Sequence, residues 1–67
     1  DVLNIQATGL LSASLMSLDG RFANVVQEAQ ASQSQLRMDV SELPRGTYLL
    51  MAEYADGKPR YKHIVLQ

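Results

Sequence analysis

The chain has 67 residues, a net charge of −1, no cysteine and one histidine, His63. This length allows one domain with a small core, and no disulfide can stabilise it. A lone histidine is a poor starting point for structural zinc, and the three cations in residues 58–62 are too few for a nucleic-acid binder. Every apolar run in the sequence is far too short to span a membrane.

Residues 2–7 form the first predicted strand, because apolar and polar side chains alternate there with period two. After a break at Thr8-Gly9, residues 10–18 predict a second strand. Asp-Gly follows it and precedes another β-like run, residues 21–27. Asp-Gly suits the positive φ angles of a type I′ turn, so we predict a hairpin with a structural turn at Asp19, Gly20 and Arg21.

Residues 27–35 are polar and lack both glycine and proline. Their propensity leans towards helix, but they offer no apolar stripe to bury. We predict the frayed end of the preceding strand followed by a polar loop, with a single helical turn as the alternative. Residues 36–40 alternate cleanly and predict a strand that buries Leu36, Met38 and Val40.

A chain reversal is predicted at residues 41–46, because Pro44 fixes φ near about −65° and Gly46 tolerates positive φ. Leu43 is its only large apolar side chain, and we expect it to cover one end of the core. Residues 47–54 are apolar on both faces, which favours a central strand or one that a partner covers.

Gly57 marks another predicted turn, and residues 60–67 predict the last strand. The total is six to seven short strands, separated by turn residues at intervals of about eight to twelve. The sequence therefore predicts an all-β fold, a small antiparallel β-sandwich within a single domain, residues 1–67. Because residue 1 is Asp and not Met, we expect a fragment of a longer, processed precursor.

No pattern typical of catalysis is present, and we predict that the chain is not an enzyme and uses no metal or cofactor. No serine lies in a nucleophile-elbow pattern, and the glycines are dispersed among turns. Asp39 and Glu42 flank a turn, where carboxylates commonly bond the local backbone. The methionines are interpreted as core fillers, with a methionine-rich binding face as the alternative: Met16, Met38 and Met51.

One layout is more specific than a generic sandwich. It combines an opening strand at residues 2–5, Gly20-Arg21 after an aliphatic run, Leu43-Pro44-Arg45-Gly46-Thr47-Tyr48, and a closing strand at residues 62–67. Over essentially the whole chain this resembles the C-terminal sorting domain (type A) of the type IX, or Por, secretion system of Bacteroidetes. Ser17 and His63 depart from the family pattern, which often has Asp and a second Lys at these positions.

The resemblance implies an immunoglobulin-like sandwich that acts as a secretion signal. It implies a covalently linked N-terminal cargo that enters the periplasm and crosses the outer membrane, to be attached to the cell surface or secreted. The implied partners are the translocon or shuttle of the secretion machinery and a sortase-like peptidase that often removes the domain. The alternative function is a generic immunoglobulin-like or fibronectin-like accessory domain that binds or acts as a spacer.

The terminal hairpin is the predicted recognition surface, because both of its halves match the family pattern and exposed sheet edges can add a strand. Such an edge also allows an edge-strand dimer. The candidate recognition residues are Pro44, Gly46, Tyr48, Lys62, His63, Ile64, Val65, Leu66 and Gln67.

Overall fold

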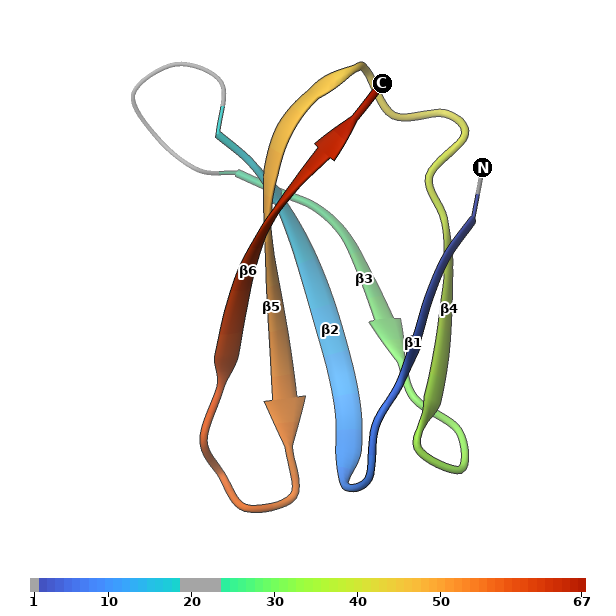
Figure 1. The fold of residues 1–67 in the computed structure, drawn as a ribbon, viewed down its shortest axis with the longest axis vertical. Coiled ribbons are helices and arrows are strands. Elements are labelled where there is room, and N and C mark those ends of the chain that lie inside the picture. Colours follow the sequence, from blue (N-terminus) through green and yellow to red (C-terminus); the bar gives the residue numbers. More distant parts are fainter. Residues whose placement is uncertain (1, 19–23) are drawn as a thin grey trace.

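The computed structural model describes residues 2–18 and 24–67, and this part of the chain forms six strands and no helix (Figure 1). All pairings are antiparallel, and the predicted small all-β sandwich is confirmed. The predicted turn at Asp19, Gly20 and Arg21 lies outside the described residues. The strands are β1 (Val2–Gln6), β2 (Leu10–Ser17), β3 (Asn24–Gln30), β4 (Gln35–Asp39), β5 (Gly46–Tyr54) and β6 (Arg60–Leu66).

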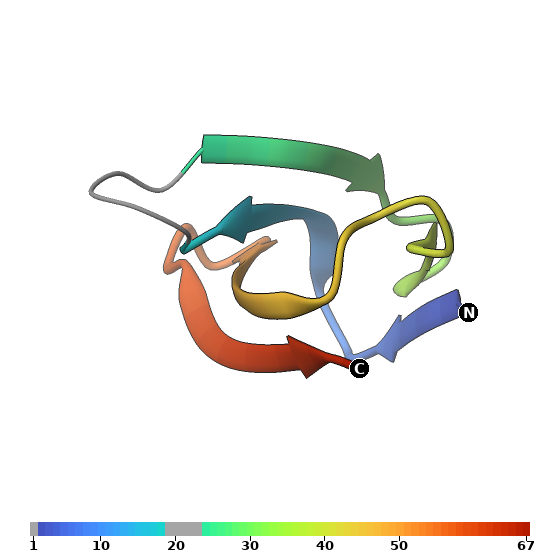
Figure 2. The ribbon, with the colours of Figure 1, turned by 90° about the horizontal axis from the view of Figure 1, so that it is seen from above.

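The strands form a two-stranded sheet, β1-β4, and a four-stranded sheet in the order β3-β2-β5-β6. Figure 2 shows the four-stranded sheet curving around the side on which β1 and β4 lie. The core between the two sheets is wholly apolar among the described residues, as period-two burial of one face predicts. It consists of Leu10, Ala13, Leu15, Leu36, Met38, Val40, Tyr48, Leu50 and Ala52.

A change of register in β2 decides which of its leucines enters the core. Leu10 pairs with Tyr54 and Ser12 pairs with Glu53, so Leu11 is an extra residue on β2. Such a β-bulge interrupts strict alternation. Leu10 is therefore buried in the same core as Ala13, whereas Leu11 is 51% exposed.

β3 corrects the prediction for residues 27–35, because the strand continues to Gln30. The backbone of these polar residues pairs with β2, with Ala29 opposite Ala13, so that they form part of an edge strand of the sheet. A strand at the edge of a sheet can expose most of its side chains, so the polar composition of this segment is compatible with β-sheet hydrogen bonding. The predicted polar loop shrinks to the connection between β3 and β4.

That connection is a two-residue turn at Gln33 and Ser34, whose φ angles are +54° and +62°. Ser32 and Gln35 exchange backbone hydrogen bonds across it, with N···O distances of 2.7 and 3.0 Å. Two consecutive positive φ angles are typical of a type I′ turn. Ser34 also ties this turn to the β1–β2 turn, since its carbonyl accepts from Ala7 N at 3.1 Å and its Oγ accepts from Gly9 N at 3.3 Å.

β5 is the predicted central strand, between β2 and β6. Its turn to β6 contains Gly57, whose φ is +81° and whose N–H donates to Tyr54 O at 2.9 Å. The start of β1 and the end of β6 lie at the same end of the molecule, on different sheets (Figure 1).

Candidate recognition surface

The segment that precedes β5 is fixed by the side chain of Tyr48. Its hydroxyl donates a hydrogen bond to Pro44 O at 2.6 Å, four residues upstream, and Tyr48 is only 2% exposed. A tyrosine near the start of a strand that bonds the preceding backbone is known from β-sandwiches as a tyrosine corner. The phenol ring therefore fills the core while its hydroxyl holds the chain reversal.

Gly46 completes this corner with a φ of +151°, a conformation that is essentially restricted to glycine. Leu43 is half-buried against the core, as expected for a residue that covers its end. Pro44 and Arg45 remain exposed. The Pro44-to-Tyr48 segment thus combines a rigid internal hydrogen bond with an accessible outer surface.

The register of β5 and β6 brings the two predicted recognition segments together. Gly46 pairs with Leu66 and Tyr48 pairs with Ile64, so the corner and the end of β6 are direct neighbours. The candidate recognition residues differ in solvent exposure. Tyr48 is buried, Gly46, Ile64 and Leu66 are half-buried, and the exposed ones are Pro44, Lys62, His63, Val65 and Gln67.

An apolar patch that sequence reasoning did not assemble lies on the outer face of the four-stranded sheet. One row crosses all four strands, because Val25 pairs with Met16, Met16 with Leu49, and Leu49 with His63. Beside this row Met51 pairs with Tyr61, and Thr47 pairs with Val65. We call Met16, Val25, Leu49, Met51, Tyr61 and Val65 the outer sheet patch.

Exposure of this patch is substantial at the sheet margins, where Val25, Tyr61 and Val65 are 56, 59 and 61% exposed. Of the three methionines predicted as core fillers, only Met38 is buried there, while Met16 and Met51 are half-buried on the outer face. Contiguous exposed apolar side chains often mark an interaction site. In the sequence, this patch was indicated by the second apolar face of residues 47–54.

Strand β6 contains the cations Arg60 and Lys62 and no acidic residue. The Arg60 guanidinium lies over the Tyr54 ring, 4.1 Å from its centroid, and 3.5 Å from the Asp56 carboxylate. Lys62 forms no ion pair with any described residue. Of the two cations on β6, Arg60 is therefore compensated by Asp56, whereas Lys62 is not compensated by any described residue.

Asp39 has a local structural role. Its Oδ1 accepts hydrogen bonds from Ser41 N at 3.0 Å and from Ser41 Oγ at 2.7 Å. The backbone hydrogen bond from Ser41, followed by the one from its hydroxyl, holds the pKa of Asp39 below its ordinary value. The prediction that this carboxylate bonds the local backbone is confirmed.

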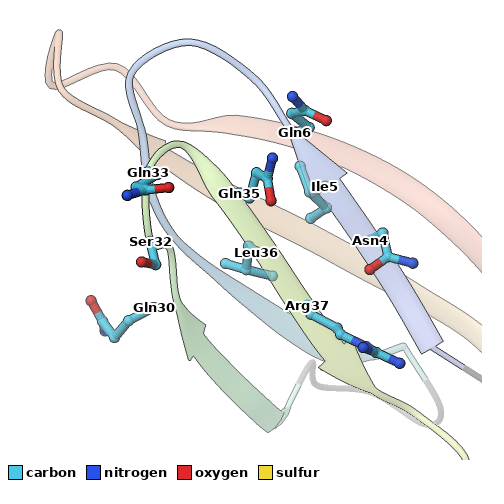
Figure 3. Close-up of a pocket in the computed structure, with 9 residues that line it drawn as sticks. All are labelled: Asn4, Ile5, Gln6, Gln30, Ser32, Gln33, Gln35, Leu36 and Arg37. Atoms are coloured by element: carbon cyan, nitrogen blue, oxygen red, sulfur yellow. The ribbon is translucent and has the colours of Figure 1, made fainter.

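A shallow polar hollow lies over β1, β4 and the adjoining turn (Figure 3). Its side chains offer amides, one hydroxyl and one guanidinium, but no acid, imidazole or thiol. That set supplies neither a nucleophile with a base nor a general acid–base pair. The lining residues are Asn4, Ile5, Gln6, Gln30, Ser32, Gln33, Gln35, Leu36 and Arg37.

Residues 2–18 and 24–67 contain no cluster of three or more histidine, cysteine or acidic side chains that could hold a metal ion. The same residues include no helix with the length and hydropathy of a membrane span.

Comparison with known proteins gives one finding. The family model described as the secretion system C-terminal sorting domain matches residues 1–67, the whole chain. Searches of curated proteins and of solved structures give no significant match.

Proposed function

Because the chain belongs to the family of C-terminal sorting domains of the type IX (Por) secretion system, we propose that it directs a covalently linked cargo across the outer membrane. The proposed route passes through the periplasm and ends at the cell surface or in the medium. The translocon or shuttle of the machinery recognises the domain, and a sortase-like peptidase then removes it by cleaving the chain upstream of β1. In the peptidase step the domain is a substrate and not a catalyst.

The proposed recognition surface consists of the Pro44-to-Tyr48 corner and β6. The observation that supports it is the pairing of Gly46 with Leu66 and of Tyr48 with Ile64, which joins both family-pattern segments in one accessible place. Pro44, Lys62, His63, Val65 and Gln67 provide the contacts. The contacts are positioned by Tyr48, which is buried, and by Gly46, Ile64 and Leu66, which are half-buried in the hairpin.

A fusion experiment tests this function. Residues 1–67, with a short upstream linker, are joined to a reporter that has its own signal for entry into the periplasm. The expected result is a surface-exposed or secreted reporter in a strain with type IX secretion, and a periplasmic reporter in a translocon-deletion strain. A reporter that stays in the periplasm of both strains contradicts the proposal and favours an accessory domain. The mass of the exported reporter shows whether the domain has been removed.

Two exposed positions separate recognition from folding. We expect Lys62→Ala and His63→Ala to reduce export while the domain stays folded, because neither side chain is buried. Arg37→Ala is the matched control, an exposed cation on β4 of the other sheet. Equal export of all three variants would place recognition elsewhere on the domain.

A further inference from the structure

The edge of β6 is the most regular free strand edge of the four-stranded sheet. Seven consecutive residues, from Arg60 to Leu66, pair with β5 without a shift of register. At the opposite margin, β3 pairs Gln27 with Leu15 but Val25 with Met16, so Val26 is an extra residue. Bulges of this kind twist an edge and oppose the addition of another strand.

The edges of the two-stranded sheet are less suitable. β1 and β4 have only five residues each. The carbonyl of Asp39 at the end of β4 already accepts a hydrogen bond from Gln27 Nε2 at 2.9 Å. β6 is therefore the edge on which an additional strand finds the longest uninterrupted row of backbone donors and acceptors.

Both faces of β6 offer apolar surface to the side chains of an added strand. Tyr61 and Val65 project on the outer face and are about three-fifths exposed, at 59 and 61%. Ile64 and Leu66 face the core but are only half-buried, because β6 is the last strand of its sheet. A neighbouring strand would cover these side chains on alternate sides, as in known strand additions.

Charge identifies the occupant. The first half of β6 contains Arg60, Lys62 and His63, and the strand has no acidic residue. A second copy that pairs antiparallel around His63 would place Lys62 opposite Ile64 and His63 opposite His63. Such self-pairing gives Lys62 no acidic side chain of β6 to pair with, whereas an acidic strand provides one.

We propose that β6 binds an extended segment of the secretion machinery as an added antiparallel strand, an inference that rests on the proposed function. This segment is acidic where it faces residues 60–63 and apolar where it faces residues 64–66. Its backbone hydrogen bonds supply the attachment, and the acidic side chains supply the specificity. Antiparallel pairing is specified because it is the more stable ladder and the one used throughout this fold.

The probes are three synthetic peptides as long as β6. The first has glutamates opposite Arg60, Lys62 and His63 and valines opposite Ile64 and Leu66. The second is identical but N-methylated at alternate residues on its pairing edge, which removes the backbone donors. The third has lysines in place of the glutamates. Nuclear magnetic resonance titration of the chain measures affinity, and hydrogen exchange measures protection of the β6 amides.

We expect only the first peptide to bind and to slow exchange at β6 but not at β3. Lys62→Glu is expected to weaken this binding by about tenfold, and the matched charge reversal Arg37→Glu should leave it unchanged. Equal binding of the N-methylated peptide overturns strand addition, and equal binding of the lysine peptide overturns the acidic partner. Concentration-dependent dimerisation through β6 without peptide binding also overturns the proposal and identifies a second copy as the occupant.

Export of the reporter fusion distinguishes a failure of the strand-addition proposal from a failure of the proposed sorting function. If wild-type and Lys62→Glu fusions are exported equally, the strand-addition proposal fails and the sorting function stands. If the wild-type fusion is not exported but the acidic peptide binds as expected, the sorting function fails and the edge remains a strand-binding site.

Discussion

Tyr48 shows how one residue can match a recognition pattern and still act from inside the molecule. Its ring lies in the core, and its hydroxyl bonds Pro44 O at 2.6 Å. In the proposed recognition surface, Tyr48 therefore acts only through the position of the corner that it holds. Removing the hydroxyl alone tests this function without leaving a cavity.

Tyr48→Phe is expected to lower the free energy of unfolding by about 1 kcal/mol, or somewhat more, because the Pro44 carbonyl loses its donor. Urea denaturation measures the change. Tyr61→Phe is the control, since Tyr61 is 59% exposed and should change stability by less than about 0.5 kcal/mol. Equal stabilities of the two variants would mean that the Tyr48 hydrogen bond contributes nothing.

Asp39 makes the stability of the fold depend on acid. Its pKa in the folded state lies below the ordinary value of 3.8, owing first to the backbone hydrogen bond from Ser41. A lowered pKa contributes stability that is present above the unfolded-state pKa and is lost as the pH falls through the folded-state pKa.

Asp39→Asn should therefore be less stable than the wild type near neutral pH, with a difference that shrinks as the pH falls below about 4. Ser41→Ala should lose part of the same pH-dependent difference, because it keeps the backbone donor and removes the hydroxyl. Thermal denaturation at a series of pH values between about 2.5 and 7 provides the comparison. Curves that run parallel at every pH would contradict this role of Asp39.

At the scale of elements, the bulge in β2 assigns adjacent leucines to opposite environments. Leu10→Ala should cost about 2–4 kcal/mol, because it removes a side chain that is 3% exposed in the core. Leu11→Ala should cost less than about 1 kcal/mol, since Leu11 is 51% exposed. Denaturant unfolding of the two variants checks the register, and a reversed order would place the bulge elsewhere.

Two strands were predictable from their apolar patterns. Residues 36–40 alternate and so indicated one buried face, whereas residues 47–54 are apolar on both faces and so indicated a central strand; the structure has β4 and β5 there. The end of β3 was not predictable in the same way, because Gln27, Glu28 and Gln30 carry no apolar periodicity. Their extended conformation depends on backbone pairing with β2, which is a tertiary contact.

The candidate site was predictable only in part, for a related reason. Its two segments are each continuous in sequence, so residues 44–48 and 62–67 could be identified separately. The outer sheet patch combines Val25, Met16 and Leu49 from three strands, and this combination exists only once the register is set. The turn at Gln33 and Ser34 could not be predicted either, because neither glutamine nor serine favours the positive φ angles that it requires.

At the scale of the whole molecule, β6 both completes the sheet and presents the proposed recognition surface. A chain of 67 residues has little stability in reserve. Deleting residues 62–67 removes the strand that pairs with Tyr48 and Leu50 in the core. We expect this truncation to unfold the domain, with loss of dispersion in the amide spectrum.

Loss of export by that truncation would therefore not distinguish a missing signal from a missing fold. Lys62→Ala should keep the dispersed amide spectrum and nevertheless export less of the fused reporter. A truncated chain that keeps its native spectrum would show that β6 is dispensable for folding, and would then make the deletion itself a clean test of recognition.

The placement of the two chain ends has a mechanical consequence. β1 starts and β6 ends at the same end of the molecule, on different sheets (Figure 1). A pulling force applied through these two points peels β1 from β4 one backbone pair at a time, beginning with Val2 and Asp39. Peeling loads each hydrogen bond in turn, whereas shear would load them all together. A domain built in this way yields to a weak pull on its ends, although it has a continuous core at rest.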